Sequence, residues 1–115
     1  NIPIEIHAVS DGLLATQFLK QKGDYSAAIK PDIILLDLNL PKINGLEVLK
    51  MVKTDPILKS IPVIILSTSS AQLDIASAYQ LNANSFISKP IDYEEFMNVM
   101  QMIYDYWFKL VQFVR

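Results

Sequence analysis

Three polar residues each end a short apolar run, and their types suit chemistry on a phosphoryl group. Asp37 follows the run Ile33 to Leu36, Ser67 closes "PVIIL" and Lys89 closes "SFIS". A carboxylate can attack phosphorus, a lysine ammonium is a point charge for phosphate oxygens, and a hydroxyl can donate to a phosphoryl oxygen. Taken singly, these residues could be a turn cap, a helix cap and a solvated side chain. Their joint placement predicts a site that forms an aspartyl phosphate.

The elements that would hold these residues alternate along the chain. Apolar, β-branched runs predict strands, at 4–9, 32–37, 62–67 and 85–90. Apolar residues at helical spacing predict helices, at 11–23, 45–56, 71–83 and 92–115, with Gly23 and Pro56 expected to end the first two. Strands that are apolar on both faces and alternate with helices are typical of an α/β fold with a parallel sheet covered on both sides. Functional crevices of such sheets lie at the carboxyl ends of the strands, so the three polar residues should meet there.

Composition limits the class of protein. The chain has 115 residues, 51% of them hydrophobic, which fits one domain over 1–115. Its apolar runs are short and its first residues lack the layout of a signal peptide. It has no cysteine, and its net charge of -2 comes from interleaved acids and bases. We therefore expect a cytoplasmic protein that binds neither membrane nor nucleic acid.

Several segments resemble the receiver domain of two-component response regulators. They are "ILLDLNLPKINGLEVL", "IPVIILSTSS" and "SFISKP", and the steps of 30 residues from Asp37 to Ser67 and 22 more to Lys89 are those of the family. "DPILKSIPVIILSTSS", "YQLNANSFISKP" and "YDYWFKLVQFV" look most like the small single-domain response regulators of bacterial and cyanobacterial phytochromes. The resemblance runs from about Ile6 to the end. It implies a flavodoxin-like, doubly wound parallel sheet and a phosphoacceptor switch rather than an enzyme. The partner it implies is a sensor histidine kinase, with a phytochrome as one candidate.

The resemblance also assigns roles to individual residues. It implies that Asp37 is the phosphoacceptor and that Asn39 offers its backbone carbonyl to Mg²⁺. Ser67 corresponds to the switch hydroxyl, and Thr68 would supply a backbone amide beside it. Lys89 corresponds to the lysine that contacts the phosphoryl group.

The remaining roles concern the strand before Lys89 and the turn after Asp37. Phe86 corresponds to the aromatic switch residue, and the Lys89–Pro90 bond is typically cis in the family. Pro41 and Gly45 suit the turn, because proline fixes φ and glycine permits a close approach of the main chain.

One departure from the family concerns the metal. Receivers begin with a central strand that ends in a pair of acids, followed by a first helix, whereas this chain opens on what resembles the second strand. The remaining acidic ligands are thus absent from this chain: "SDGLLA" places Asp11 as a helix cap, and Asp32 lies at the wrong end of its strand. Because Mg²⁺ is held by one or two carboxylates with phosphate and water, we expect Asp37 alone to bind it weakly. We also expect the natural protein to contain the missing strand and helix upstream.

The last predicted helix is apolar around much of its circumference. One set of its apolar residues is sufficient to face the sheet, and a second, aromatic set remains. Exposed aromatic surface marks a partner interface, although the same residues could simply enlarge the core. We expect a homodimer through the last two helices and the last strand, anchored by Tyr104, Trp107, Phe108 and Phe113.

Two other functions compete with a phosphoacceptor receiver. A pseudo-receiver would only bind proteins, which the missing acidic pair favours and the intact Asp37, Ser67 and Lys89 oppose. A phosphatase resembling the haloacid dehalogenases would also use an aspartate nucleophile, but that family has a second acid where this chain has Asn39. The sole histidine, His7, is expected to be an ordinary strand residue rather than a ligand.

Overall fold

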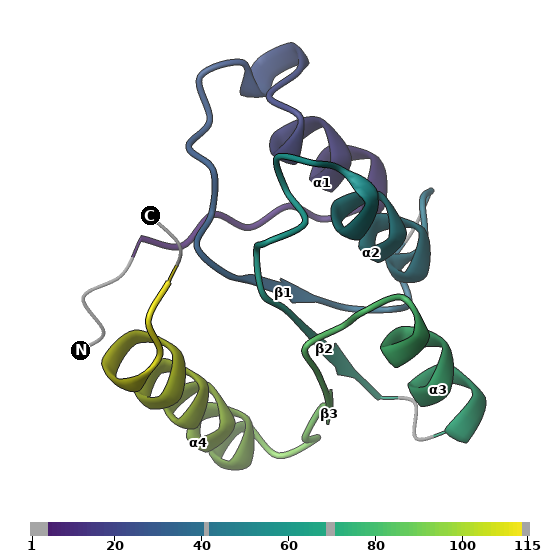
Figure 1. Cartoon of the computed structure of the whole chain (residues 1–115). Coiled ribbons are helices and arrows are strands. Elements are labelled where there is room, and N and C mark those ends of the chain that lie inside the picture. The colour runs from purple at the N-terminus through teal and green to yellow at the C-terminus, as the bar shows by residue number, and fades with distance from the viewer. Residues whose placement is uncertain (1–4, 41, 69–70, 114–115) are drawn as a thin grey trace. The chain divides into compact units, whose positions relative to one another are not determined.

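The computed structural model describes residues 5–40, 42–68 and 71–113 (Figure 1). They form two compact units, one spanning Ala8–Ser88 and one made of the described residues of Asn1–His7 and Lys89–Arg115. The elements in chain order are α1 (Gly12–Leu19), a 3-10 turn (Gly23–Tyr25), β1 (Ile34–Leu36), α2 (Gly45–Thr54), β2 (Val63–Ser67), α3 (Gln72–Gln80), β3 (Ser85–Ser88), α4 (Tyr93–Tyr104) and a π-helix (Asp105–Leu110).

The strands of the first unit form one parallel sheet. Its order is β1-β2-β3, with Leu36 opposite Ile65 and Ser67 opposite Ser88. The predicted α/β architecture with parallel strands is therefore confirmed. The predicted strand at 4–9 is wrong over its described part, because residues 5–9 have no regular structure. A strand needs a neighbouring strand for its N–H and C=O groups, and the sheet formed by β1, β2 and β3 does not include these residues.

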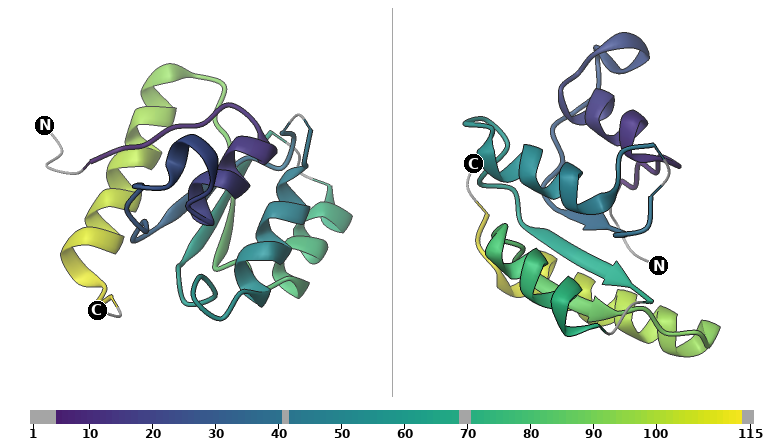
Figure 2. Two further views of the ribbon diagram at one scale, coloured as in Figure 1. Left: turned by 90° about the horizontal axis from the view of Figure 1, so that it is seen from above. Right: turned by 90° about the vertical axis from the view of Figure 1, so that its right-hand side faces the viewer.

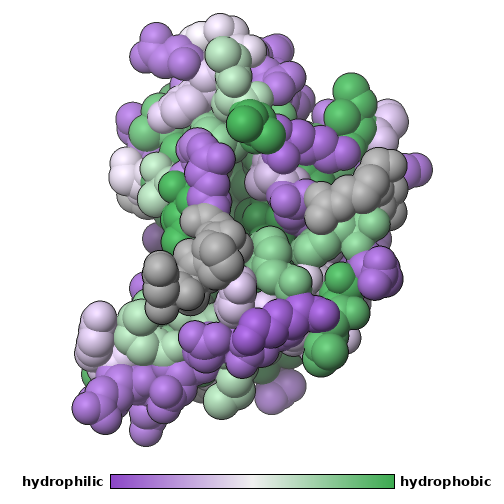
Figure 3. Space-filling model, turned by 90° about the vertical axis from the view of Figure 1, so that its left-hand side faces the viewer, coloured by the Kyte–Doolittle hydropathy of each residue, from purple (hydrophilic) through white to green (hydrophobic). Residues whose placement is uncertain are grey.

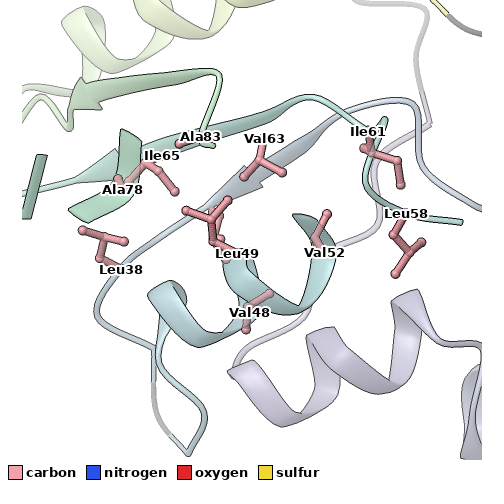
Figure 4. Packing of buried hydrophobic residues seen from close by; sticks show 11 residues of the cluster. Leu38, Val48, Leu49, Val52, Leu58, Ile61, Val63, Ile65, Ala78 and Ala83 are labelled. Atoms are coloured by element: carbon pink, nitrogen blue, oxygen red, sulfur yellow. The ribbon is translucent and has the colours of Figure 1, made fainter. Parts of the chain in front are cut away.

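The core of this unit lies between the sheet and α2. All five residues of β2 are buried, so this strand is covered on both faces, as its unbroken apolar run predicts. Val48, Leu49 and Val52 form the buried stripe of α2, and they pack with Val63 and Ile65 of β2 in one cluster (Figure 4). Burying each such side chain contributes about 1.5 to 3 kcal/mol. This packing fixes β2, and with it the residue that ends β2.

Short polar side chains begin the two helices that precede and follow β1. The N–H of Leu14 donates to Asp11 Oδ1 (2.8 Å), and the N–H of Glu47 donates to Asn44 Oδ1 (3.0 Å). Such caps each stabilise a helix by about 1 kcal/mol. Asp11 is thus a helix cap, as its sequence context predicts. The two helices, α1 and α2, lie side by side (Figure 2).

The first helix ends earlier than its sequence predicts. It stops at Leu19 rather than at Gly23, and Gln21 takes the left-handed conformation with φ of 57°. A glycine tolerates positive φ without cost, but it does not decide where a helix ends. The end of α2 at Thr54, two residues before Pro56, agrees with the prediction.

A polar cluster holds the amino-terminal ends of β2 and β3 together. Asn84 Oδ1 accepts from the N–H of Val63 (2.9 Å) and from Lys53 Nζ (3.2 Å). Lys53 Nζ also donates to the carbonyls of Ile61 (2.7 Å) and Lys59 (3.3 Å). Burial lowers the pKa of Lys53, because desolvation penalises its charged form. The cluster sets the register of β2 against β3 at the edge opposite the candidate site.

The second unit consists mainly of α4 and the π-helix that continues it. Asp92 caps α4 by accepting the N–H of Glu95 (3.0 Å). The predicted helix over 92–115 is too long, because helical structure ends at Leu110 and Val111 is extended (φ -79°, ψ 139°). The widened last turn is closed by a hydrogen bond from the N–H of Val111 to the carbonyl of Tyr106 (3.1 Å). Helical spacing alone does not reveal such a change of register.

The described residues contain no cis peptide bond, so the cis Lys89–Pro90 bond expected from the resemblance is wrong; the trans isomer is the intrinsically favoured one. His7 is exposed and bonded to Glu5 (2.9 Å), and it lies in an irregular segment rather than a strand.

The surface is mixed in character. On the face drawn in Figure 3, hydrophilic and hydrophobic side chains are intermixed outside the grey residues. Among the helices formed by the described residues, none is both long enough and apolar enough to cross a bilayer.

Candidate functional site

Asp37 is the first residue after β1 and is half-buried. Its Oδ1 accepts the N–H of Asn39 (2.9 Å), which closes an Asx-type turn at the carboxyl end of the strand. The carboxylate is therefore oriented by the main chain two residues further on. Asn39 itself is exposed beside it.

Gly45, the first residue of α2, packs closely against the main chain of Asp37 and Leu38. The N–H of Gly45 donates to the carbonyl of Leu38 (3.0 Å). A Cβ at position 45 would collide with the carbonyl oxygen of Asp37 and with the Cα of Leu38. The predicted close approach at Gly45 is thus confirmed, while Pro41 lies outside the described residues.

Replacing Gly45 by alanine should lower the free energy of unfolding by about 3 kcal/mol, the upper end of the usual cost of overpacking, because the obstructing atoms are main chain. The matched control is Gly23→Ala, where φ is +59° and nothing lies within 4 Å of the added Cβ. Its cost should be only the strain of the left-handed conformation, about 1 to 2 kcal/mol. Urea unfolding measures both, and a Gly45→Ala variant as stable as the wild type would contradict this packing.

Ser67 and Thr68 lie at the carboxyl end of the neighbouring strand. Ser67 ends β2 and is fully buried, whereas Thr68 is exposed. Leu36 pairs with Ile65, so Asp37 and Ser67 lie one and two residues beyond that pair. Adjacent strands run about 4.8 Å apart. The fold thus brings Asp37 and Ser67 to one edge of the sheet from positions 30 residues apart.

Phe86 and Lys89 belong to the third strand and its end. Phe86 lies opposite Ile65 and packs against the core cluster. Ile65 and Ser67 share a face because side chains alternate along a strand, so Phe86 is on the same face of the sheet as the Ser67 hydroxyl. Lys89 is exposed and directly follows β3, and it belongs to the second unit.

The described acidic residues supply only part of the ligands that a metal site needs. The described residues contain no group of three or more His, Cys, Asp or Glu side chains that could hold a metal. Asp11 caps α1 and lies 3.6 Å from Lys42 Nζ, which agrees with a structural role. Asp37 with the carbonyl of Asn39 is a smaller donor set than Mg²⁺ takes from a complete site. No chemical step is therefore assigned to a metal held by these residues alone.

Comparisons with known proteins agree with this arrangement. Residues 3–101 match the family described as the response regulator receiver domain. Response regulator Rcp1 of Synechocystis sp. is 40% identical over 107 residues, which are 93% of this chain and 73% of Rcp1.

Two solved structures are similar over nearly the whole chain. The crystal structure of the phosphorylated cyanobacterial phytochrome response regulator RcpA is 42% identical with a TM-score of 0.96, covering 98% of this chain and 81% of that one. The Mn²⁺-bound form of Rcp1 is 38% identical with a TM-score of 0.94, covering 100% and 83%. The chain belongs to the response regulator receiver domain family, and it is a flavodoxin-like receiver of two-component signalling rather than a classical enzyme.

Proposed function

We propose that Asp37 accepts a phosphoryl group from a sensor histidine kinase and that this event switches a protein-interaction surface. The observation that carries the proposal is the position of Asp37, whose carboxylate is oriented at the end of β1, at the same edge of the sheet as the buried Ser67 of β2. A carboxylate oxygen attacks phosphorus, the bond from phosphorus to the kinase histidine breaks, and the imidazole leaves. The direct test is phosphoryl uptake by this chain and by its Asp37→Asn variant.

Other residues complete the proposed site. Lys89 would contact a phosphoryl oxygen through its ammonium, and the Thr68 amide would donate beside Ser67. Support comes from the relatives: RcpA has been crystallised phosphorylated and Rcp1 with Mn²⁺. RcpA is a phytochrome response regulator, and two further similar structures are bacteriophytochrome response regulators. A phytochrome kinase is therefore the proposed partner. The cytoplasm is the proposed compartment.

The proposed metal is Mg²⁺, bound by Asp37 and the Asn39 carbonyl when the acidic pair of a complete receiver is also present. Phosphorylation is therefore tested on residues 1–115 and also on an extended chain. The extended chain is residues 1–115 preceded by a receiver's first strand and first helix, which carry the acidic pair. Isothermal titration with Mn²⁺ should find clearly tighter binding to the extended chain.

Ser67 and Phe86 are the proposed transmitters of the phosphoryl signal. A hydroxyl drawn toward the phosphoryl group vacates space, into which an aromatic side chain on the adjacent strand can move. Phe86 is on the correct face for this, opposite Ile65, two residues before the Ser67–Ser88 pair.

Substituting Ser67 by alanine should leave phosphoryl uptake by the extended chain largely intact but weaken the effect of phosphorylation on association. Analytical ultracentrifugation before and after incubation with acetyl phosphate measures that effect. The matched control is Ser60→Ala, an exposed serine in the connection between α2 and β2, which should respond as the wild type does. If Ser67→Ala associates on phosphorylation as strongly as the wild type, the coupling is wrong.

A pseudo-receiver is the second candidate function. The described residues contain no group of three or more possible metal ligands, which favours a pseudo-receiver for residues 1–115 taken alone. It predicts no phosphoryl uptake by either the chain or the extended chain. The phosphatase alternative has no such support, because the chain belongs to the receiver family and carries Asn39 in place of a second acid.

Homodimerisation through the carboxyl-terminal part is the proposed output surface. Tyr104 stacks on Phe108 (centroids 5.8 Å apart), and Phe113 lies 5.6 Å from Phe108 and 6.3 Å from Trp107. These anchors are partly buried by one another. Next to them Met102, Tyr106 and Leu110 recur every four residues with 66%, 55% and 72% of their surfaces exposed. An exposed apolar stripe braced by packed aromatic rings suits a protein interface.

A further inference from the structure

A hydrogen bond links α3 to the main chain of the proposed switch strand. The N–H of Phe86 donates to the hydroxyl oxygen of Tyr79 (3.0 Å). Tyr79 is in the last turn of α3 and its side chain remains 48% exposed. The contact therefore reaches from the surface of a helix to the backbone of the residue whose movement is proposed to carry the signal.

The bonded N–H is one that the sheet leaves open. Among the described residues β3 pairs only with β2, so it is an edge strand of the sheet. An edge strand presents N–H groups that have no ladder partner on its outer side. Tyr79 supplies an acceptor to one of these groups, at the position of Phe86.

The helix that carries Tyr79 buries little apolar surface. Of the nine residues of α3 only Ala78 is buried. Leu73, in the first turn, is 80% exposed. A helix with few buried apolar residues can shift at small cost, so a hydrogen bond from its side chain to the sheet can help to set its position.

We propose that Tyr79 is a positioning residue of the switch: its hydroxyl ties α3 to the main chain of Phe86, so that movement of Phe86 displaces α3. The inference rests on the proposed function and names the element that the switch moves. The Phe86 side chain packs against the core cluster, on the same face of the sheet as Ser67. The Phe86 N–H donates to the Tyr79 hydroxyl. A change at the buried hydroxyl is thereby conveyed to an exposed helix surface.

The first test removes the acceptor oxygen. In unphosphorylated residues 1–115, Tyr79→Phe should speed hydrogen exchange of the Phe86 amide by about 5- to 10-fold, the effect of losing one hydrogen bond. O-methyltyrosine at position 79 keeps the acceptor oxygen and should restore slow exchange, whereas 4-methylphenylalanine, of similar size, should not. The control is Tyr93→Phe in the other unit, where the side chain is 73% exposed. Unchanged exchange at Phe86 in Tyr79→Phe would overturn the inference.

The second test distinguishes a role of Tyr79 in transmitting the switch from a purely structural role of its hydrogen bond. Phosphorylation of the extended chain should change the exchange rates of the α3 amides, and in Tyr79→Phe this change should shrink severalfold while phosphoryl uptake by intact mass stays equal. O-methyltyrosine should restore the response. An undiminished α3 response in Tyr79→Phe would overturn the inference even if the Phe86 amide exchanged faster. Failure of the wild-type extended chain to gain mass would instead count against the proposed function.

Discussion

The extended chain should gain one phosphoryl group from acetyl phosphate in the presence of Mg²⁺, and Asp37→Asn should abolish that gain. Asparagine has nearly the shape of aspartate and its side-chain oxygen can still accept the Asn39 N–H, which Asp37 Oδ1 accepts at 2.9 Å. The turn should therefore persist while the nucleophile is lost. Intact-mass spectrometry measures the gain directly, and peptide mapping should place it on residue 37.

A control and a comparison make this result specific. Asp32→Asn, near the amino-terminal end of β1, should take up the phosphoryl group as the wild type does. Residues 1–115 without the acidic pair should react much more slowly, because the described residues contain no group of three or more His, Cys, Asp or Glu side chains that could hold the metal ion. Equal uptake by wild type and Asp37→Asn would remove Asp37 as the acceptor, and no uptake by either form would favour the pseudo-receiver.

The parts of the fold that the sequence predicts well are those decided by local pattern. β2 is an unbroken apolar run, and such a run is stable only when buried on both faces, as all five of its residues are. Asp11 and Gly45 could be interpreted from their neighbours alone, since a cap and a tight turn are formed within a few residues. The placement of Asp37 and Ser67 at one edge of the sheet is predictable because the carboxyl ends of parallel strands meet there.

The errors concern structure that depends on distant partners. Residues 5–9 have the composition of a strand, but strand formation needs a paired neighbour and sequence pattern does not supply one. The end of the last helix depends on a π turn and on packing among Tyr104, Trp107, Phe108 and Phe113. The contact of Tyr79 is not predictable from the sequence for the same reason. It is one hydrogen bond from the Phe86 N–H to the Tyr79 hydroxyl, and no local sequence pattern indicates it.

Light scattering at micromolar concentration should find a homodimer, and replacing Tyr104 and Phe108 together by glutamate should convert it to a monomer. The two rings stack at 5.8 Å, so the substitution removes the centre of the aromatic cluster as well as placing charge at the contact. Burying an unpaired charge costs about 3 to 5 kcal/mol, which corresponds to a dissociation constant raised by about 10² to 10⁴-fold. Asp105, next to this cluster, accepts from Lys109 (3.1 Å) and Gln101 (2.9 Å), which lowers the pKa of Asp105 and keeps a carboxylate charged beside any added glutamate.

Because Tyr104 and Phe108 also pack within their own unit, a second variant must separate loss of the interface from loss of the fold. Met102→Glu with Tyr106→Glu changes side chains that are 66% and 55% exposed in one chain, so a single copy should tolerate both changes while the dimer should not. Circular dichroism checks that each variant keeps its helix content. The control is Ile57→Glu, a similarly exposed apolar residue (71%) in the connection between α2 and β2, which should stay dimeric. A monomeric wild type, or a folded Met102→Glu, Tyr106→Glu variant that remains dimeric, would exclude this surface as the dimer contact.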